Sequence, residues 1–450
     1  MISLPHNFIF GIAESDLQTV GSLFPQKREY AQKTMWENFS RKKGLDTPLY
    51  GSYKFENYKT DVQLLGKLGI KEYRTSISMS RTIDRNGRIN KKALRWYRNY
   101  FELIRKQNIK IHACLYHWEA PETFFPNGIL DKNFTDYYLK HIKIVLGHLS
   151  DLIDYYIPIN ELWCVCYLAY YVGIHAPGDK SIAKFFKAYL KAIDLQSKAI
   201  QTIKNTSVKN KIGIVNIHFP TYVTKLSEKY LRTRDLADNL TNYLYSDPFF
   251  LGEIDEAVVR KFRKFFPPDY QNIIRQAKLS QLIDYYGINY YNSQYVKPQN
   301  NDFGYEMEIP GEAMRNSLGW PISLSPYYPD GLTDLLLSLT NRYKGFNLKR
   351  LLVSENGTPL YTPFKTGQTP QDDFRIFFLS QHLKQIEQAL KKGAKVDGYF
   401  LWTLLDNYEW QEGYKPESAF GLVAIDKKGK RVPKKSYYWY QKIIKQQNER

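Results

Sequence analysis

Two glutamates stand where short apolar runs give way to polar residues. Glu355 comes soon after the apolar residues 351–353, and Glu161 follows Ile159 and Asn160. A carboxylate at the mouth of a buried strand must be solvated, paired or used in chemistry, because an unpaired buried charge is costly. For either residue alone, a salt bridge is the simpler interpretation. Two such carboxyl groups facing one pocket would suit glycosidic bond cleavage, in which one donates a proton and the other attacks or stabilises the sugar.

The neighbours of each glutamate can set its protonation state. A nearby cation and hydrogen-bond donors keep a carboxylate ionised, whereas apolar surroundings and a second carboxylate raise its pKa. Arg74 and Tyr291 are the natural partners for Glu355, and the apolar residues 162–165 directly after Glu161 would supply the apolar side of that group.

Short apolar runs alternate with helical patterns along the chain. Expected strands lie at 8–13, 70–76, 109–115, 155–159, 212–217, 283–288, 351–353 and 396–401. Expected helices lie near 57–68, 91–107, 133–150, 181–204, 230–245, 330–343, 371–392 and 434–446. Strict alternation predicts a parallel sheet covered on both faces. Eight such units in 450 residues favour an α/β fold, a single (β/α)8 TIM barrel with long βα loops, with residues 1–450 as one domain.

Candidate functional residues recur at the carboxyl ends of these strands, where barrel enzymes carry their chemistry. They are Gln18, Arg74, His117, Trp118, Asn160, Glu161, Asn289, Tyr291, Glu355, Trp402, Glu409 and Trp410. A lone His or Asn at a strand end is more often a hydrogen-bonded structural residue. Their shared placement on one face of one barrel favours a common site.

Seven motifs in order carry a resemblance to a known family. They are Phe10-Gly11 with Gln18, residues 73–81 (YRTSISMSR), 115–121 (LYHWEAP), 159–161 (INE) followed by 176–178 (APG), 287–291 (GINYY), 353–357 (VSENG) and 401–410 (LWTLLDNYEW). Together they resemble glycoside hydrolase family 1, the retaining β-glucosidase and β-galactosidase family of (β/α)8 enzymes. The resemblance covers essentially the whole chain.

The resemblance implies a role for each of these residues. Glu161 would be the acid/base and Glu355 the nucleophile of a retaining exo-β-glycosidase that acts on a small β-glycoside or oligosaccharide. Arg74, Asn289 and Tyr291 would orient and stabilise Glu355. Substrate-binding residues would be Gln18, His117, Trp118, Asn160, Trp402, Glu409 and Trp410, with Asn160 at the sugar 2-hydroxyl and Trp402 as a stacking floor. No metal or organic cofactor is implied.

Glu409 bears on whether the sugar is phosphorylated. Family members that act on 6-phosphorylated sugars resemble one another in having a small residue there, with a Lys and a Tyr downstream. A carboxylate at this position would repel a phosphate, so an unphosphorylated glucoside, and with it galactoside or fucoside, is expected. A 6-phospho-β-glycosidase remains the alternative, with Lys415 as its possible phosphate ligand; a solvated loop lysine is the simpler interpretation of Lys415.

The chain departs from the family pattern at several positions. These are Val20, Met79, Leu162, Gln196, Thr403 and Ala419. None removes a proton donor, a nucleophile or a sugar-binding side chain, so activity is expected to survive, while the aglycone preference stays open. Trp320 is either an aglycone-site aromatic or a packing residue.

Composition admits other classes of function. The net charge of +19 and pI near 9.4 would suit a polyanion-binding protein, but the basic residues are spread along the chain, so no specific nucleic-acid partner is expected. A non-catalytic sugar-binding relative should lack one of the two glutamates.

Three cysteines without a Cys-x-x-Cys pattern indicate neither a disulfide framework nor a zinc site. The start lacks a signal-peptide pattern and no apolar run is long enough for membrane insertion, so a cytoplasmic protein, possible as an oligomer, is expected.

Overall fold

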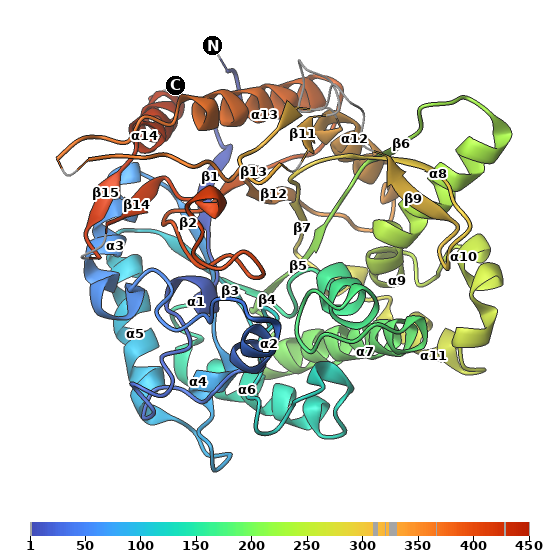
Figure 1. Ribbon diagram of the computed structural model, residues 1–450, viewed down its shortest axis with the longest axis horizontal. Coiled ribbons are helices and arrows are strands. Elements are labelled where there is room, and N and C mark those ends of the chain that lie inside the picture. Colours follow the sequence, from blue (N-terminus) through green and yellow to red (C-terminus); the bar gives the residue numbers. More distant parts are fainter. Residues whose placement is uncertain are drawn as a thin grey trace.

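The alternating apolar runs form a closed barrel of parallel strands in the computed structural model (Figure 1). Residues 2–308, 314–319, 321–323, 331–365, 367–426 and 429–449 are described. Around the barrel the strands run β1 (Ile9–Ala13), β2 (Glu72–Ser76), β3 (Lys110–Cys114), β4 (Tyr155–Ile157), β5 (Lys211–Ile217), β7 (Tyr285–Asn289), β12 (Leu351–Asn356) and β13 (Gly398–Trp402). Pairing of β1 with β13 closes the ring. The predicted (β/α)8 fold is confirmed.

Helices surround the barrel and cover its outer face (Figure 1). The larger ones are α3 (Lys54–Leu68), α5 (Lys91–Lys106), α6 (Phe134–Leu149), α7 (Ile182–Thr206), α8 (Glu228–Thr241), α12 (Leu332–Arg342), α13 (Asp373–Lys391) and α14 (Lys435–Asn448). Each is apolar on one face; in α5, for example, Leu94, Tyr97, Phe101 and Ile104 are buried at helical spacing. This pattern explains why the sequence predicted these helices to within a few residues.

Shorter elements lie in the loops between barrel units. Helices are α1 (Asp16–Thr19), α2 (Met35–Lys43), α4 (Met79–Thr82), α9 (Asp247–Phe250), α10 (Glu256–Lys261) and α11 (Tyr270–Ala277). Strands are β6 (Thr221–Tyr222), β8 (Gln294–Pro298), β9 (Tyr305–Glu308), β10 (Met314–Arg315), β11 (Pro321–Ser323), β14 (Val423–Ile425) and β15 (Arg431–Pro433). No helix in the described part of the chain is long and apolar enough to cross a bilayer.

Two barrel strands differ in extent from the prediction. The strand expected at 351–353 continues to Asn356, so Glu355 lies within β12 and pairs with Asn289 of β7. The register of β12 shifts between Val353 and Glu355. Conversely, β4 ends at Ile157, and Asn160 reaches Val215 only through an isolated bridge. A polar residue can end an apolar pattern without ending the strand, because ladder hydrogen bonds use the backbone.

Bulky side chains close the interior of the barrel. The ring of His112 stacks on Tyr155 at 4.3 Å between centroids, and Tyr285 lies edge-on to Tyr155. His112 also contacts Glu72 at 2.8 Å, so both polar groups are satisfied inside the barrel. The interior is therefore a packed core, and the strand ends are left for chemistry.

Candidate active site

Glu355 is held by a cationic donor and a neutral donor. Its side chain is 4% exposed. An ion pair joins its Oε1 to the Arg74 guanidinium, which comes from β2, and the Tyr291 hydroxyl donates to its Oε2 at 2.7 Å. Both predicted contacts are present. Burial beside the Glu355 charge holds the pKa of Tyr291 well above its usual range, so the phenol keeps the proton that it donates.

Glu161 has different neighbours. Its Oε1 accepts a hydrogen bond from Asn289 Nδ2 at 2.6 Å, and its Oε2 lies 2.9 Å from the Cys164 thiol, both of them neutral donors. Burial, with the Glu355 charge as the second cause, raises the pKa of Glu161 to about 8. Within one site, one carboxyl group is thus paired with a cation and the other is kept protonated near neutral pH.

The backbone at Glu161 has a conformation that non-glycine residues rarely adopt. Its φ is +50°, and Trp118, at the end of the neighbouring strand, has a φ of +71°. Left-handed conformations cost a non-glycine residue on the order of 1–3 kcal/mol and cluster at functional sites. A π-helix, Cys164–Val172, follows directly. This rare turn type is frequent at functional sites, and here it places Cys164 against Glu161.

Asn289 is placed differently from the prediction. It was expected to support Glu355, but its side-chain amide donates to Glu161 Oε1 rather than to Glu355. Ser354 Oγ donates to Asn289 Oδ1 at 2.7 Å, which orients the amide with its NH2 group toward Glu161. Asn289 lies between two strands: its backbone pairs with Glu355 of β12 on one side and with Ile217 of β5 on the other, and its amide turns to Glu161.

Asn160 connects the two halves of the site. Its Oδ1 accepts from Arg74 Nη2 and, at 3.3 Å, from Asn289 Nδ2. Its Nδ2 lies 3.2 Å from His117 Nε2. Burial and the Arg74 charge hold the pKa of His117 well below its usual range, so the ring is neutral. If Nε2 accepts from Asn160, the ring proton is on Nδ1, a buried atom that has no hydrogen-bond partner among the described residues.

Glu409 and Gln18 form a second polar pair at the same end of the barrel. Gln18 Nε2 donates to Glu409 Oε2 at 3.3 Å and to the Tyr408 carbonyl at 2.9 Å, while Ser15 Oγ donates to Gln18 Oε1 at 2.6 Å. Burial, followed by the charges of Glu355, Glu412 and Glu161, raises the pKa of Glu409 to about 8. Glu355 and Glu161 are thus close enough to Glu409 to influence its titration.

Aromatic rings surround these polar groups. His117 lies nearly parallel to Trp402 and to Trp410, at 6.2 and 5.9 Å between centroids. Trp118 packs on Trp410 at 4.7 Å and donates from Nε1 to the Asn160 carbonyl at 2.9 Å. Trp118, Trp402 and Trp410 therefore gather at one place.

Two members of this aromatic cluster were missed in the sequence. Trp36, in α2, packs on Trp410 at 4.6 Å and donates to the Trp118 carbonyl at 2.7 Å. His175 packs against Trp36 and Trp118. Neither residue follows a barrel strand. The Ala176-Pro177-Gly178 motif beside His175 was the available signal, and nothing local marked Trp36. The sequence indicated Cys164 only as part of the apolar surroundings of Glu161, although its thiol contacts the Glu161 carboxyl group.

The remaining sequence expectations have varied outcomes. Lys415 pairs with Glu412 at 2.7 Å, with its side chain 58% exposed, so it is a solvated loop lysine here. Thr403 Oγ1 and the Gln196 amide are buried without partners among the described residues. The Ala419 carbonyl accepts from Arg375. Trp320 lies outside the described residues. Within the described chain, no three His, Cys, Asp or Glu side chains form a metal-binding group.

Comparison with known proteins agrees with this geometry. The family profile "Glycosyl hydrolase family 1" matches residues 1–449. The "1,4-beta-D-glucan glucohydrolase" of Thermotoga neapolitana is 29% identical, with 99% of each chain covered. The "6-phospho-beta-galactosidase" of Clostridium acetobutylicum is also 29% identical, covering 98% of this chain and 97% of its own. The family 1 β-glucosidase structure from Thermotoga maritima superposes with a TM-score of 0.91 at 27% identity, covering 100% and 99%. The chain therefore belongs to glycoside hydrolase family 1 and is a glycoside hydrolase of the β-glucosidase-like type.

Proposed function

We propose that this enzyme is a retaining exo-β-glycosidase that releases terminal, unphosphorylated β-D-glucosyl residues, and also β-D-galactosyl or β-D-fucosyl residues, from small β-glycosides. The observation that carries the proposal is the unequal surroundings of the two carboxyl groups. Glu355 contacts a guanidinium and a phenol, whereas Glu161 contacts a neutral amide and a thiol. This asymmetry suits an ionised nucleophile opposite a protonated acid.

In the first step, Glu355 attacks the anomeric carbon while Glu161 gives its proton to the leaving oxygen. The glycosidic C–O bond breaks, the aglycone departs as an alcohol, and a covalent glycosyl–Glu355 ester remains. Arg74 and Tyr291 hold the carboxylate in position before the attack. Because Asn289 donates to Glu161, it acts as a positioning residue for the acid rather than for the nucleophile.

In the second step, Glu161, now ionised, takes a proton from a water molecule that attacks the same carbon. The ester bond to Glu355 breaks, and the sugar leaves with its original β configuration. Glu161 regains its proton from that water, so both carboxyl groups return to their starting states. The Cys164 thiol and the Asn289 amide can donate to the ionised form between the two steps.

Sugar hydroxyls would meet polar atoms around the two carboxyl groups. Gln18 and Glu409 are already joined and would share a hydroxyl pair. If His117 Nε2 accepts from Asn160, the buried Nδ1, which has no partner among the described residues, carries a proton for a ligand that reaches it. Asn160 lies between Arg74 and His117, at the place where a hydroxyl next to the anomeric carbon would sit. Trp402 and Trp410 would cover the apolar face of the ring.

Residues around Glu409 favour an unphosphorylated sugar, although 6-phospho-β-galactosidases are among the relatives. With a pKa of about 8, Glu409 is mostly neutral near pH 7, so charge repulsion is a weaker reason than the sequence suggested. The stronger reason is that Lys415, the candidate phosphate ligand, is paired with Glu412 instead. A neutral carboxyl beside Gln18 matches a hydroxyl group better than a phosphate.

A panel of aryl glycosides tests the substrate. Wild-type enzyme is expected to hydrolyse aryl β-glucoside, with β-galactoside or β-fucoside also turned over, and not 6-phospho-β-glucoside. Glu409→Ala should lose activity on the unphosphorylated sugars while remaining folded. Turnover of the phosphorylated substrate alone would reject the unphosphorylated assignment, and no turnover of any glycoside would reject the proposed substrate class.

The roles of the two glutamates have a separate test. Glu355→Ala should lower kcat by about 10⁴-fold or more, because the nucleophile is removed. Added azide should restore turnover and yield an α-glycosyl azide, since azide then attacks from the face that Glu355 occupied. A β-configured azide would show that the roles are assigned the wrong way round.

We also infer a reducing, cytoplasmic location. All three cysteines are buried free thiols. Free cysteines suit a reducing compartment, where disulfides are rare.

Both predicted catalytic glutamates are present, which disfavours a non-catalytic relative.

A further inference from the structure

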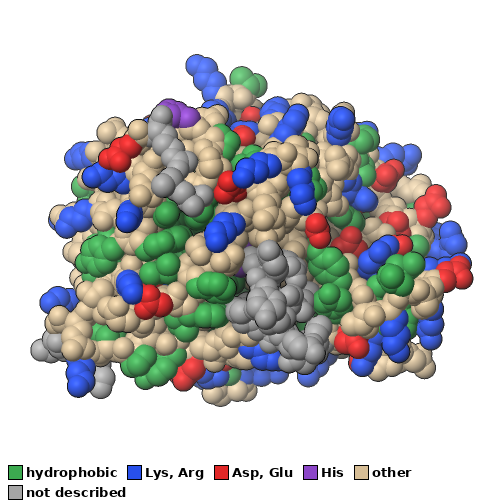
Figure 2. All heavy atoms as spheres, turned by 90° about the horizontal axis from the view of Figure 1, so that it is seen from above, with side chains coloured by type: hydrophobic (Ala, Val, Ile, Leu, Met, Phe, Trp, Pro, Cys, Tyr) green, Lys and Arg blue, Asp and Glu red, His purple; other side chains and the backbone are tan. Residues whose placement is uncertain are grey.

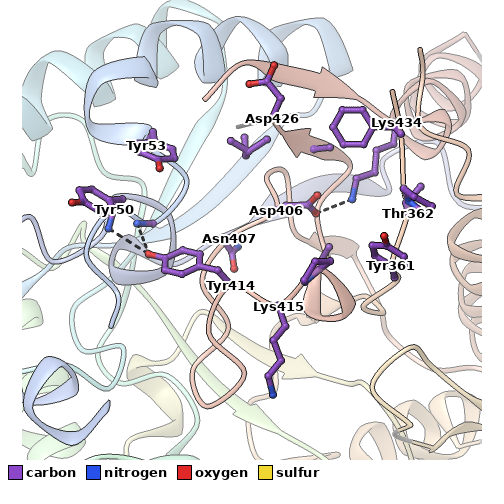
Figure 3. A pocket seen from close by; sticks show the side chains of 17 residues that line it. Tyr50, Tyr53, Tyr361, Thr362, Asp406, Asn407, Tyr414, Lys415, Asp426 and Lys434 are labelled. Atoms are coloured by element: carbon purple, nitrogen blue, oxygen red, sulfur yellow. Dashed lines mark hydrogen bonds and ion pairs between the residues drawn. The ribbon is translucent and has the colours of Figure 1, made fainter. Parts of the chain in front are cut away.

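A second cavity, separate from the catalytic glutamates, opens between the loop after β13 and residues near the N-terminal end of α3. Its volume is about 540 Å³, within the range of roughly 300–1,000 Å³ that small-molecule sites occupy. Its lining includes Tyr50, Tyr53, Tyr361, Asp406 and Tyr414 (Figure 3). None of the residues assigned to catalysis or glycone binding lines it.

Exposed tyrosines are concentrated in this pocket. The side chains of Tyr50, Tyr53, Tyr361 and Tyr414 are 45%, 42%, 50% and 39% exposed, values that rank among the highest for large apolar residues in the described chain. Tyr50 and Tyr53 stack in parallel at 5.7 Å. Figure 3 shows this pair on one side of the pocket and Tyr361 on the other, with Asp406 between them. A flat ligand with two apolar faces would gain contact with both walls.

Polar groups of the lining are placed to bind hydroxyl groups rather than an ion. Asp406 Oδ1 accepts from Lys434 Nζ at 2.7 Å, and Lys415 pairs with Glu412 at 2.7 Å, so both lysines in the described lining already have carboxylate partners. Asn407 and Thr362 add an amide and a hydroxyl. The described charges of Asp406, Asp426, Lys415 and Lys434 sum to zero, which disfavours a strongly anionic or cationic ligand.

The pocket shares a loop with the catalytic site. Residues 403–422 carry Asn407 and Tyr414 on the pocket and Glu409 and Trp410 on the catalytic side. Reciprocal backbone hydrogen bonds join Glu409 and Gly413 in a tight turn, and Tyr414 follows directly. The Tyr414 hydroxyl accepts from the backbone N–H groups of Tyr50 and Gly51, which anchors this end of the loop.

We propose that this pocket is an accessory binding site for a neutral saccharide of one or two sugar units. Tyrosine faces on opposite sides contact the C–H faces of the sugar ring, and Asp406, Asn407 and Thr362 bind its hydroxyls. The site is independent of the catalytic assignment, because none of its ligand contacts uses Glu161 or Glu355.

Equilibrium titration of the full chain tests this assignment. The probes are cellobiose and methyl β-D-glucopyranoside, and the protein is Glu355→Gln, in which hydrolysis is blocked. Two binding events per chain are expected. Tyr361→Ala and Tyr50→Ala, each added to this background, should weaken one event by about tenfold and leave the other unchanged, because each removes one stacking wall.

Tyr438→Ala is the matched control. Tyr438 is also 50% exposed but lies on α14, outside the pocket, so both events should persist. A single binding event, or a second event that neither Tyr361→Ala nor Tyr50→Ala weakens, would overturn the proposal. Failure of the wild type to hydrolyse any glycoside, with the Tyr361-dependent event intact, would overturn the proposed function and leave the accessory site standing.

Discussion

In the proposed mechanism, Glu161 is protonated in the first step and ionised in the second, and its surroundings suit both states. Burial and the Glu355 charge raise its pKa to about 8, while the donors Cys164 and Asn289 act in the opposite direction. A group with this pKa is mostly protonated at pH 7 and loses its proton as the pH rises further. This protonation state matches the acid role that we propose for Glu161.

We expect kcat/KM to fall as the pH rises through about 8, because the free enzyme then loses the acidic proton of Glu161. This fall is the alkaline limb of the pH–rate profile. It is measured with an aryl glycoside whose aglycone is a poor leaving group. Glu161→Gln should remove most activity on such a substrate and much less on a dinitrophenyl glycoside, whose leaving group needs no proton.

Glu409 has a pKa of about 8 as well, so the alkaline limb belongs to interacting groups rather than to one residue. Glu409→Gln is the control: the limb should remain, since the acid is still present. A limb that disappears in Glu409→Gln but survives in Glu161→Gln would contradict the assignment of the acid.

Cys164 is expected to tune the acid. Its thiol, 2.9 Å from Glu161 Oε2, stabilises the ionised carboxylate and so lowers the pKa of Glu161. Cys164→Ala should move the alkaline limb upward by roughly 0.4 to 1 pH unit, since a hydrogen bond contributes about 0.5–1.5 kcal/mol and one unit equals about 1.4 kcal/mol. Cys164→Ser retains a donor and should move it less. A downward shift in Cys164→Ala would show that the thiol does not act in this way.

Among the elements, the barrel strands position the site and also fill the interior beneath it. Gly213 in β5 has no room for a side chain, because a Cβ atom there would lie 2.0 Å from the ring of Tyr285. Tyr285 in turn contacts His112 Nδ1 at 3.0 Å. The strand can follow its path around the barrel only with glycine at this position.

Gly213→Ala is expected to destabilise the fold by about 1–3 kcal/mol, the usual cost of overpacking a core. Gly147→Ala is the matched control, because Gly147 lies in α6 and a Cβ atom added there would have no atom of a neighbouring element within 4 Å among the described residues. That change should stabilise the helix by about 0.5–1 kcal/mol. Thermal unfolding should move the two melting temperatures in opposite directions; a decrease in both would indicate that Gly147 is constrained as well.

Across the whole molecule, the charge of +19 is distributed rather than gathered. On the face seen in Figure 2, Lys and Arg side chains are scattered, with Asp and Glu among them. Several basic side chains are paired, such as Arg431 with Asp61 and Lys54 with Glu14, both of them buried. Basic side chains spread in this way attract anions at long range, but they do not form a surface that is complementary to one particular polyanion.

Binding to nucleic acid is therefore expected to be weak and to depend strongly on salt. Anisotropy of a labelled DNA duplex should show binding at about 50 mM salt and little at about 200 mM, because counterion release is its main source. Tight or sequence-selective binding at the higher salt would support the polyanion-binding alternative.

Much of the fold could be predicted because the signals for it are local. Period-2 and period-3.6 apolar patterns are readable within a dozen residues, so the eight strands and their principal helices were located to within a few residues. The end of β12 was misplaced because the polar Glu355 continues the strand and pairs with Asn289. Side-chain polarity is a poor guide to where a strand ends, because ladder hydrogen bonds use backbone groups.

The sequence by itself determined the barrel, the family resemblance and the two glutamates at strand ends. The sequence also predicted that Arg74 meets Glu355, 281 residues away, but only the tertiary structure decided that the Asn289 amide turns to Glu161 instead. It also brought Trp36 and Cys164 to the site and gathered the tyrosines of the accessory pocket. The physical reason is that motifs record residue types along the chain, whereas contacts depend on strand register and loop packing between distant segments.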